Sequence, residues 1–493
     1  MELQKQNIML ERVPLRIKSQ AAAEGEISPP GSMPPIDYIL SIDGRTTASA
    51  EALDNTILVD GAVNLGILYV CSAGLVHGFD SVAIFKHNID MPGSKAGSRC
   101  EINPTVGTIE HKVIDGAVSV RAVVSIDCTQ FQREDIPVVS QINDMPLEQK
   151  VIDFSSQTIN NDIMELNIHE DVRLPRPIEK ILGVGGHIRT QSVSKEGDQA
   201  LIEGILRLSA LYVAPDGTLM QTPLVLPFTH YADIDGDATA LSAISRFLTL
   251  NASQVDEDII SIESNIEISL NSTIAQNYQA LSDAYSIGAD SIDCIQDQLM
   301  LNKNEHVDCR CSVRVNATVP SGLPDVDRVM VARFRPQINK SEAMDASINL
   351  EGTLHSSFIY LDRDGGLHGF DAQIPFECMG EAPSFNPDME ISVSAACELI
   401  HAGASGDEIP LQVALEISAD GYYNDVISVI KSVDHSERAI TTFGPMVYFP
   451  SKDETLWDVG KRFAISLDDL RELNPDIGEQ TPKSVLLNLR KPD

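Results

Sequence analysis

The sequence is poor in positive charge and in long apolar segments. Among its 493 residues, 36 are Lys or Arg and 72 are Asp or Glu, which gives a formal net charge of -36. A polyanion repels nucleic acid and anionic membrane surfaces, so direct binding to either is not expected. No stretch approaches the ~18 consecutive apolar residues of a transmembrane helix, so no direct membrane insertion is expected. Residues 1–20 lack the apolar core of a secretion signal, and export by the general route is not expected either.

The cysteines lack the order of a disulfide framework or of a metal site. Eight are present, and they do not recur at equivalent positions of the repeats described below. Without an export signal they are expected to be reduced thiols within strands. Cys309 and Cys311 have one residue between them, whereas a metal site usually has a two-residue spacer and a second pair. The sequence therefore predicts no metal and no cofactor.

The sequence also lacks a spacing of residues that is typical of a catalytic site. No arrangement of Ser, His and Asp, or of Cys and His, indicates a nucleophile, so no catalytic residue is predicted and the protein is expected not to be an enzyme. A triad assembled from distant parts of the chain stays open as an alternative, because such triads are defined in space rather than in sequence.

Three gap-free copies of one segment are present, at 59–85, 202–228 and 350–376. Each copy has a tyrosine 8, a glycine 13 and a phenylalanine 24 residues after a reference glycine. These residues are Gly61, Tyr69, Gly74 and Phe85 in the first copy, Gly204, Tyr212, Gly217 and Phe228 in the second, and Gly352, Tyr360, Gly365 and Phe376 in the third. Alternating apolar residues before the later glycine predict a β-hairpin with that glycine at positive φ in the turn.

A later strand recurs with each hairpin. Apolar residues alternate over 118–126, 260–268 and 409–417. The complete unit spans roughly 140 residues, the size of an independent domain with its own core. Several short strands separated by turn signals favour a β-sandwich. The stretch AAAEGEISPPGSMPP at 21–35 is interpreted as a loop. We therefore predict a mainly β protein with three tandem sandwich-like repeats, at 1–145, 146–299 and 300–443.

After Pro445 the pattern changes to strand, helix, helix, strand, and we predict a small α+β module at 444–493. Thr455 and Asp458 have the spacing of a helix-capping box, as do Ser466 and Asp469. The apolar residues of each predicted helix share one face. They are Leu456, Val459 and Phe463 in the first helix and Leu467, Leu470 and Leu473 in the second.

This C-terminal segment resembles a LysM domain. The opening Tyr-x-x-x-x-Gly-Asp-Thr-Leu-Trp is matched by 448–457, the Ala-x-x-Tyr/Phe part by 460–463 and the Leu-x-x-Leu-Asn-Pro part by 470–475. The segment departs from glycan-binding members at Asp453-Glu454, where Gly-Asp is common, and at 486–489. The predicted partner- or glycan-binding residues lie in the two loops and at the start of the first helix. They are Lys452, Asp453, Glu454, Thr455, Trp457, Asn474, Pro475 and Asp476.

Trp457 is the only tryptophan in the chain. It follows a helix cap, while Leu456 and Val459 take the positions that face the predicted core. A large aromatic ring at the rim of a module is the kind of residue that anchors a protein interface. The alternative is that the ring covers the small core of the module.

The three upstream copies resemble SPOCS domains, named for spore coat and sporulation proteins. The resemblance lies in a Val/Leu-Asp/Glu-Gly, a Leu/Ile-Tyr-Val/Leu, a Gly-x-x-His-Gly-Phe and an Ile-Pro-Phe signature, and it covers most of 34–417. The second copy departs at 220–222, which reads Met-Gln-Thr where the others read His-Gly-Phe.

Three such copies followed by one LysM module is the layout of a clostridial family of coat-morphogenesis proteins. This resemblance implies a structural adaptor in the mother cell, at the forespore surface. It implies that the LysM-like module binds the basement-layer ATPase of the coat, of the stage IV sporulation protein A type, with other coat proteins as further partners. The alternative is a cell-wall protein whose module binds peptidoglycan or other polymers of N-acetylglucosamine.

Overall fold

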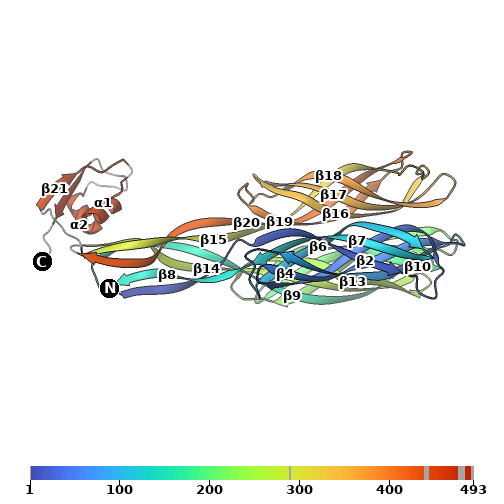
Figure 1. The fold of residues 1–493 in the computed structure, drawn as a ribbon, viewed down its shortest axis with the longest axis horizontal. Coiled ribbons are helices and arrows are strands. Elements are labelled where there is room, and N and C mark those ends of the chain that lie inside the picture. The colour runs from blue at the N-terminus through green and yellow to red at the C-terminus, as the bar shows by residue number, and fades with distance from the viewer. Residues whose placement is uncertain (1, 288–289, 438–443, 453, 476–483, 490–493) are drawn as a thin grey trace.

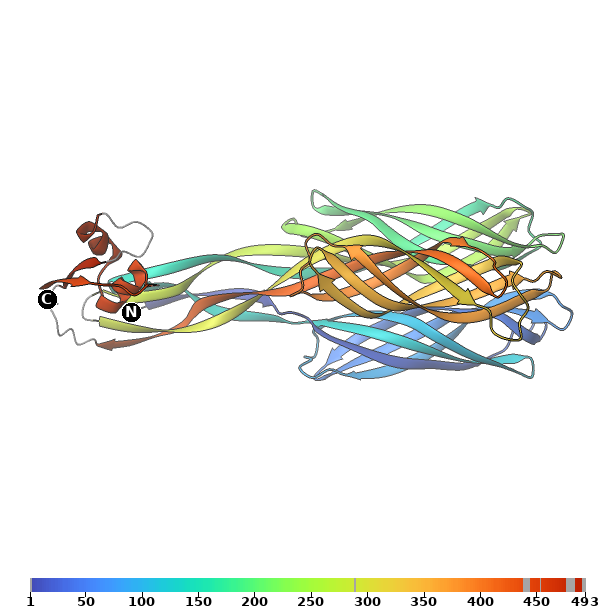
Figure 2. The same cartoon turned by 90° about the horizontal axis from the view of Figure 1, so that it is seen from above.

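The computed structural model describes residues 2–287, 290–437, 444–452, 454–475 and 484–489. The described chain is mainly β, as predicted, and its strands form small antiparallel sheets. Figures 1 and 2 show a head of three lobes, a narrow stalk that leaves one end of the head, and a C-terminal module beside the free end of the stalk. In the described part of the chain, no helix has the length and apolar character needed to cross a membrane.

Each lobe consists of two three-stranded sheets that enclose one apolar core. Lobe 1 contains β3 (Ile36–Leu53), β4 (Thr56–Cys71) and β5 (Val76–Asp90), packed on β2 (Leu15–Ile27), β7 (Ala117–Phe131) and β6 (Arg99–Ile114). Lobe 2 contains β10 (Lys180–Glu196), β11 (Gln199–Val213) and β12 (Leu219–Asp233), packed on β13 (Ala238–Asp256), β14 (Ile259–Ser286) and β9 (Leu147–Arg173). Lobe 3 contains β16 (Arg328–Met344), β17 (Ser347–Leu361) and β18 (Leu367–Glu381), packed on β15 (Asp290–Thr318), β20 (Glu408–Glu437) and β19 (Glu390–Ala402).

The repeated residues build the same hairpin in each lobe. The turn glycines Gly74, Gly217 and Gly365 have φ of 77°, 78° and 84°, so the predicted positive φ is confirmed. The three repeated tyrosines are fully buried at equivalent positions of β4, β11 and β17. The reference glycine lies under the repeated phenylalanine of the next strand. A Cβ atom on Gly61, for example, would lie 2.4 Å from the Phe85 ring. A contact between neighbouring strands therefore explains the constant spacing of 24 residues between the reference glycine and the phenylalanine.

The predicted alternating strands are also confirmed, as parts of β7, β14 and β20. The interpretation of 21–35 as a loop is wrong for its first half. Residues up to Ile27 belong to β2, and Ala21 and Ala23 are buried against the core of lobe 1. Alanine has a weak strand preference, and here the pairing of β2 with β7 decides the local conformation.

The stalk is built from strands that run out of all three lobes. Strand β1 (Glu2–Glu11) pairs with β8 (Arg133–Asn143), the first part of β9 pairs with the last part of β14, and the first part of β15 pairs with the last part of β20. These three ribbons bury apolar residues against one another. The buried residues are Ile8, Leu10, Val138, Ala280, Leu299, Leu301 and Val429, followed along the stalk by Val139, Ile142, Leu281, Ala284, Ile292, Ile430 and Val433. The predicted repeat boundaries stay predictions, and the one at 299 falls inside β15.

The three lobes also share an apolar cluster, which lies where the hairpins of neighbouring lobes meet. It takes residues from corresponding strands of every lobe: Leu40, Leu68, Val70, Leu182, Leu211, Val331 and Ile359. At this meeting point the glycines of two hairpins approach the neighbouring lobe closely. A Cβ atom on Gly78 of lobe 1 would lie 2.2 Å from the Leu182 carbonyl oxygen of lobe 2. One on Gly369 of lobe 3 would lie 1.9 Å from the Leu40 carbonyl oxygen of lobe 1.

The C-terminal module contains β21 (Gly444–Tyr448), α1 (Leu456–Phe463), α2 (Leu467–Leu473) and β22 (Val485–Leu489), and the two strands pair antiparallel. Thr455 and Asp458 form the predicted capping box of α1, and Ser466 caps α2 by accepting a hydrogen bond from the Asp469 backbone N–H. A small cluster forms the module's core: Val459, Ile465, Leu470, Val485 and Leu487. Leu473, on the expected apolar face of α2, is exposed instead.

Candidate functional site

Six of the eight predicted binding residues are described by the structure, and Asp453 and Asp476 lie outside the described residues. Lys452 and Pro475 are exposed on the module surface. The other four make contacts within the chain, and these contacts divide into two groups. One group holds the module together, and the other joins the module to the stalk.

Glu454 and Asn474 hold the loops of the module. Glu454 accepts hydrogen bonds from the Tyr448 hydroxyl at 2.9 Å and from the Ser451 backbone N–H at 3.0 Å. These bonds, the Ser451 one first, keep the pKa of Glu454 below its ordinary value. The Asn474 amide bonds to the backbone of β22, accepting from Leu486 N–H at 2.7 Å. Both residues therefore have structural roles, beside that of Thr455 as helix cap.

Trp457 faces the stalk. Its indole N–H donates to Asp283 Oδ2 at 2.8 Å, and its ring meets the Tyr285 ring edge-on, with 4.9 Å between centroids. Asp283 and Tyr285 both belong to β14. Trp457 is only partly buried and is absent from the core cluster of the module. The structure thus gives this side chain a position that neither alternative from the sequence included, at a contact between two parts of the chain.

Four further contacts surround Trp457. Lys461 Nζ lies 2.6 Å from Asp283 Oδ1, so both oxygens of this carboxylate are occupied. The Tyr285 hydroxyl donates to the Ile465 carbonyl at 3.0 Å, and burial raises the pKa of this hydroxyl, which keeps it protonated. Glu148 accepts a hydrogen bond from the Leu467 backbone N–H at 2.9 Å. Finally, Gly460 lies directly against the Tyr285 hydroxyl.

We call this set of residues the docking contact. It comprises Glu148, Asp283 and Tyr285 of the stalk and Trp457, Gly460, Lys461, Ile465 and Leu467 of the module. Glu148 and Tyr285 are direct partners in the pairing of β9 with β14, so one ribbon of the stalk presents both. Sequence reasoning selected Trp457 as an interface residue and missed all three stalk residues.

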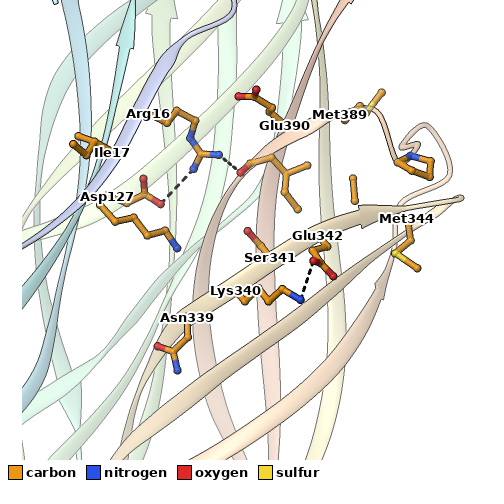
Figure 3. A pocket seen from close by; sticks show the side chains of 14 residues that line it. Arg16, Ile17, Asp127, Asn339, Lys340, Ser341, Glu342, Met344, Met389 and Glu390 are labelled. Atoms are coloured by element: carbon orange, nitrogen blue, oxygen red, sulfur yellow. Dashed lines mark hydrogen bonds and ion pairs between the residues drawn. The ribbon is translucent and has the colours of Figure 1, made fainter. Parts of the chain in front are cut away.

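A cleft of about 650 Å³ lies between lobes 1 and 3 (Figure 3). Arg16 forms an ion pair with Asp127 at 3.3 Å and donates to the Ile391 carbonyl, which joins the two lobes across the cleft. Lys340 forms an ion pair with Glu342 at 2.8 Å on the other wall. These four charged side chains are therefore paired within the protein.

The eight cysteines are free thiols. In the described ranges, no three or more His, Cys, Asp or Glu residues are grouped so as to hold a metal ion. The best-defined polar contacts described above join parts of the chain to one another. The fold and these contacts define an elongated β protein with interlocked lobes and a small docked module.

Comparison with family models adds a second line of evidence. The family model described as SipL, SPOCS domain matches residues 35–114 and 325–404. These segments lie in lobes 1 and 3, so the predicted SPOCS resemblance is confirmed for two of the three copies. The match indicates a sporulation-related protein. No curated protein and no solved structure gives a significant match. The likeness of the C-terminal module to a LysM domain stays a prediction.

Proposed function

We propose that this protein is a non-enzymatic structural adaptor in the assembly of the spore coat or envelope, located in the mother cell at the forespore surface. The observation that carries the proposal is the pair of SPOCS-domain matches within one three-lobed head. The elongated shape supports it, because the head and the module lie at opposite ends of the stalk (Figure 1) and so can contact different partners.

The C-terminal module is the proposed contact for the basement-layer ATPase of the coat, a protein of the stage IV sporulation protein A type. The module exposes apolar side chains that a soluble domain of this size would be expected to bury. Val447 and Leu486 are direct partners in the β21–β22 pairing and are each 51% exposed, and Phe449 beside them is 72% exposed. Together with Trp457, these residues supply the apolar surface of a protein interface.

The direct test is retention of the purified ATPase by the full chain and by a chain that ends at residue 437. The adaptor role predicts that only the full chain retains the ATPase. Trp457→Ala should weaken this binding by roughly 2 kcal/mol or more while circular dichroism shows an intact fold, since Trp457 lies outside the module's core. Lys86→Ala, on an exposed ion pair of lobe 1, is the matched surface control.

The same proteins should also be tested on chitin oligomers, because the LysM resemblance supports a cell-wall function as the second candidate. Micromolar binding to chitin oligomers without binding to the ATPase would reject the adaptor role and establish the cell-wall one.

A further inference from the structure

The docking contact places the stalk on a surface of the module that a partner would use. Asp283 binds the Trp457 indole with one oxygen and Lys461 with the other, at 2.8 and 2.6 Å. The Tyr285 ring packs on the indole ring in a T-shaped arrangement, and its hydroxyl donates to the Ile465 carbonyl. Hydrogen bonds that involve a charged group are about twice as strong as neutral ones, so Asp283 is the centre of this contact.

The module is also shaped for this contact at Gly460. A Cβ atom there would lie 2.3 Å from the Tyr285 hydroxyl oxygen and 3.0 Å from its ring carbon, and 3.1 Å from the Ile465 carbonyl oxygen of the module itself. Gly460 lies within α1, where glycine is the least favourable residue apart from proline. Alanine would favour the helix, but its Cβ would force Tyr285 away. The tightest contact is with the stalk, so glycine at this position makes room for Tyr285 in the docked arrangement.

We infer that the stalk holds the module in a closed state, in which Asp283 and Tyr285 occupy the Trp457 surface, and that a protein partner of the module must displace them. The partner in this inference is the one in the proposed function, and that half of the inference rests on it. The closed state itself depends only on the docking contact. A partner competing with an internal contact binds with an apparent affinity reduced by the fraction of open molecules.

The closed state can be measured without any partner, because Trp457 is the only tryptophan of the chain and its fluorescence reports the docking contact. The test uses the full chain with Gly460→Ala, which leaves Trp457, Asp283 and Tyr285 unchanged, and with Asp283→Asn. Both variants should shift the emission maximum to longer wavelength and increase quenching by acrylamide. Asp297→Asn removes a stalk carboxylate that pairs with Lys431 of the stalk rather than with the module, and it should leave the emission unchanged.

Two results would overturn the closed state. One is an emission spectrum of the unmodified chain that already corresponds to a fully exposed indole. The other is an unchanged spectrum in both Gly460→Ala and Asp283→Asn. Circular dichroism of each variant separates undocking from unfolding, and Gly460→Ala is expected to keep or improve the helix signal.

Competition is then measured by titrating the same four full chains with the purified coat ATPase. Gly460→Ala and Asp283→Asn should bind about tenfold tighter than the unmodified chain, since breaking a charge-assisted contact raises the open fraction by about that factor. Equal affinities for all four chains would overturn the competition and leave the adaptor role intact. Absence of binding by every chain would overturn the adaptor role, and the fluorescence result alone would then decide the closed state.

Discussion

Lobes 1 and 3 share a glycine in the hairpin that lobe 2 lacks, and this difference distinguishes residues needed for folding from residues needed for packing between lobes. Gly78 and Gly369 press against backbone carbonyls of the neighbouring lobes, where no Cβ atom would fit. Lobe 2 has Gln221 at this position, and its amide donates to Ser209 of its own sheet at 2.8 Å. All three hairpins nevertheless have the same strands and turn. The glycine of the His-Gly-Phe motif therefore serves packing between lobes rather than the fold of a lobe.

The family matches follow the same division. The SPOCS model matches lobes 1 and 3, which carry this glycine, at 35–114 and 325–404. Lobe 2 keeps the reference glycine, the buried tyrosine and the phenylalanine, which are the residues that build the hairpin. A repeat copy that does not make one of the lobe–lobe contacts can have another residue in place of this glycine and still keep its fold.

Gly369→Val should cause the largest loss of stability among the substitutions that test this difference between the lobes. Its side chain would collide with the Leu40 backbone, and overpacking of this kind costs about 3 kcal/mol of unfolding free energy. Gln221→Val in lobe 2 should change stability by less than about 0.5 kcal/mol, the usual range for surface substitutions. Denaturant unfolding of the two full-length variants measures both values. Similar losses in the two would show that the hairpin position has the same role in all lobes.

Gly365→Val should cost roughly 1–2 kcal/mol or more, because a β-branched residue is strained at positive φ. Nothing lies within 4 Å of the Cβ positions at Gly365 and Gly217, so neither substitution creates a clash. Gly217→Val in lobe 2 should therefore lose the same amount. Thermal melts compare the two, and a clear difference between them would contradict a turn common to all lobes.

Tyr360→Phe and Tyr212→Phe should differ by about 1 kcal/mol, the net value of one hydrogen bond. The Tyr360 hydroxyl donates to the Pro324 carbonyl at 2.7 Å, whereas the buried Tyr212 hydroxyl has no partner among the described residues. Removing the Tyr212 hydroxyl should be neutral or slightly stabilising. Equilibrium unfolding in urea is the measurement, and an equal loss in both variants would contradict the difference between the lobes.

Gln221→Gly should cost about 0.5–1 kcal/mol, because glycine adds flexibility to a strand. It introduces the residue of lobes 1 and 3 without the neighbouring carbonyl that gives it a role. A gain in stability in thermal unfolding would show that glycine alone is enough to tighten the lobe 2 hairpin against lobe 3.

The hairpins could be predicted from the sequence because their determinants are local and occur three times. The turn glycine, the buried tyrosine and the cross-strand phenylalanine lie within 25 residues of one another in every copy. The stalk could not be predicted, since its core joins residues as distant as Ile8, Ala280 and Val429. The prediction of a loop at 21–35 was wrong for the same reason. The strand in its first half pairs with β7, which is about 100 residues away in the sequence.

The candidate site was predicted only in part. The caps of α1 and α2 follow from short-range patterns in the module, and such patterns also singled out Trp457, although not its contact with the stalk. The partner of Trp457 does not, because Asp283 is 174 residues away and nothing in a single sequence marks that pair. Glu454 and Asn474 were chosen for their place in the loops, whereas their side chains bond within the module.

Fractionation of sporulating cells tests the central claim, an adaptor role in the spore coat, most directly. The full chain should be recovered in the spore coat extract together with the basement-layer ATPase, and the chain ending at residue 437 should be lost from that extract. Recovery of the full chain in the vegetative cell-wall fraction, and its absence from the coat extract, would contradict the adaptor role.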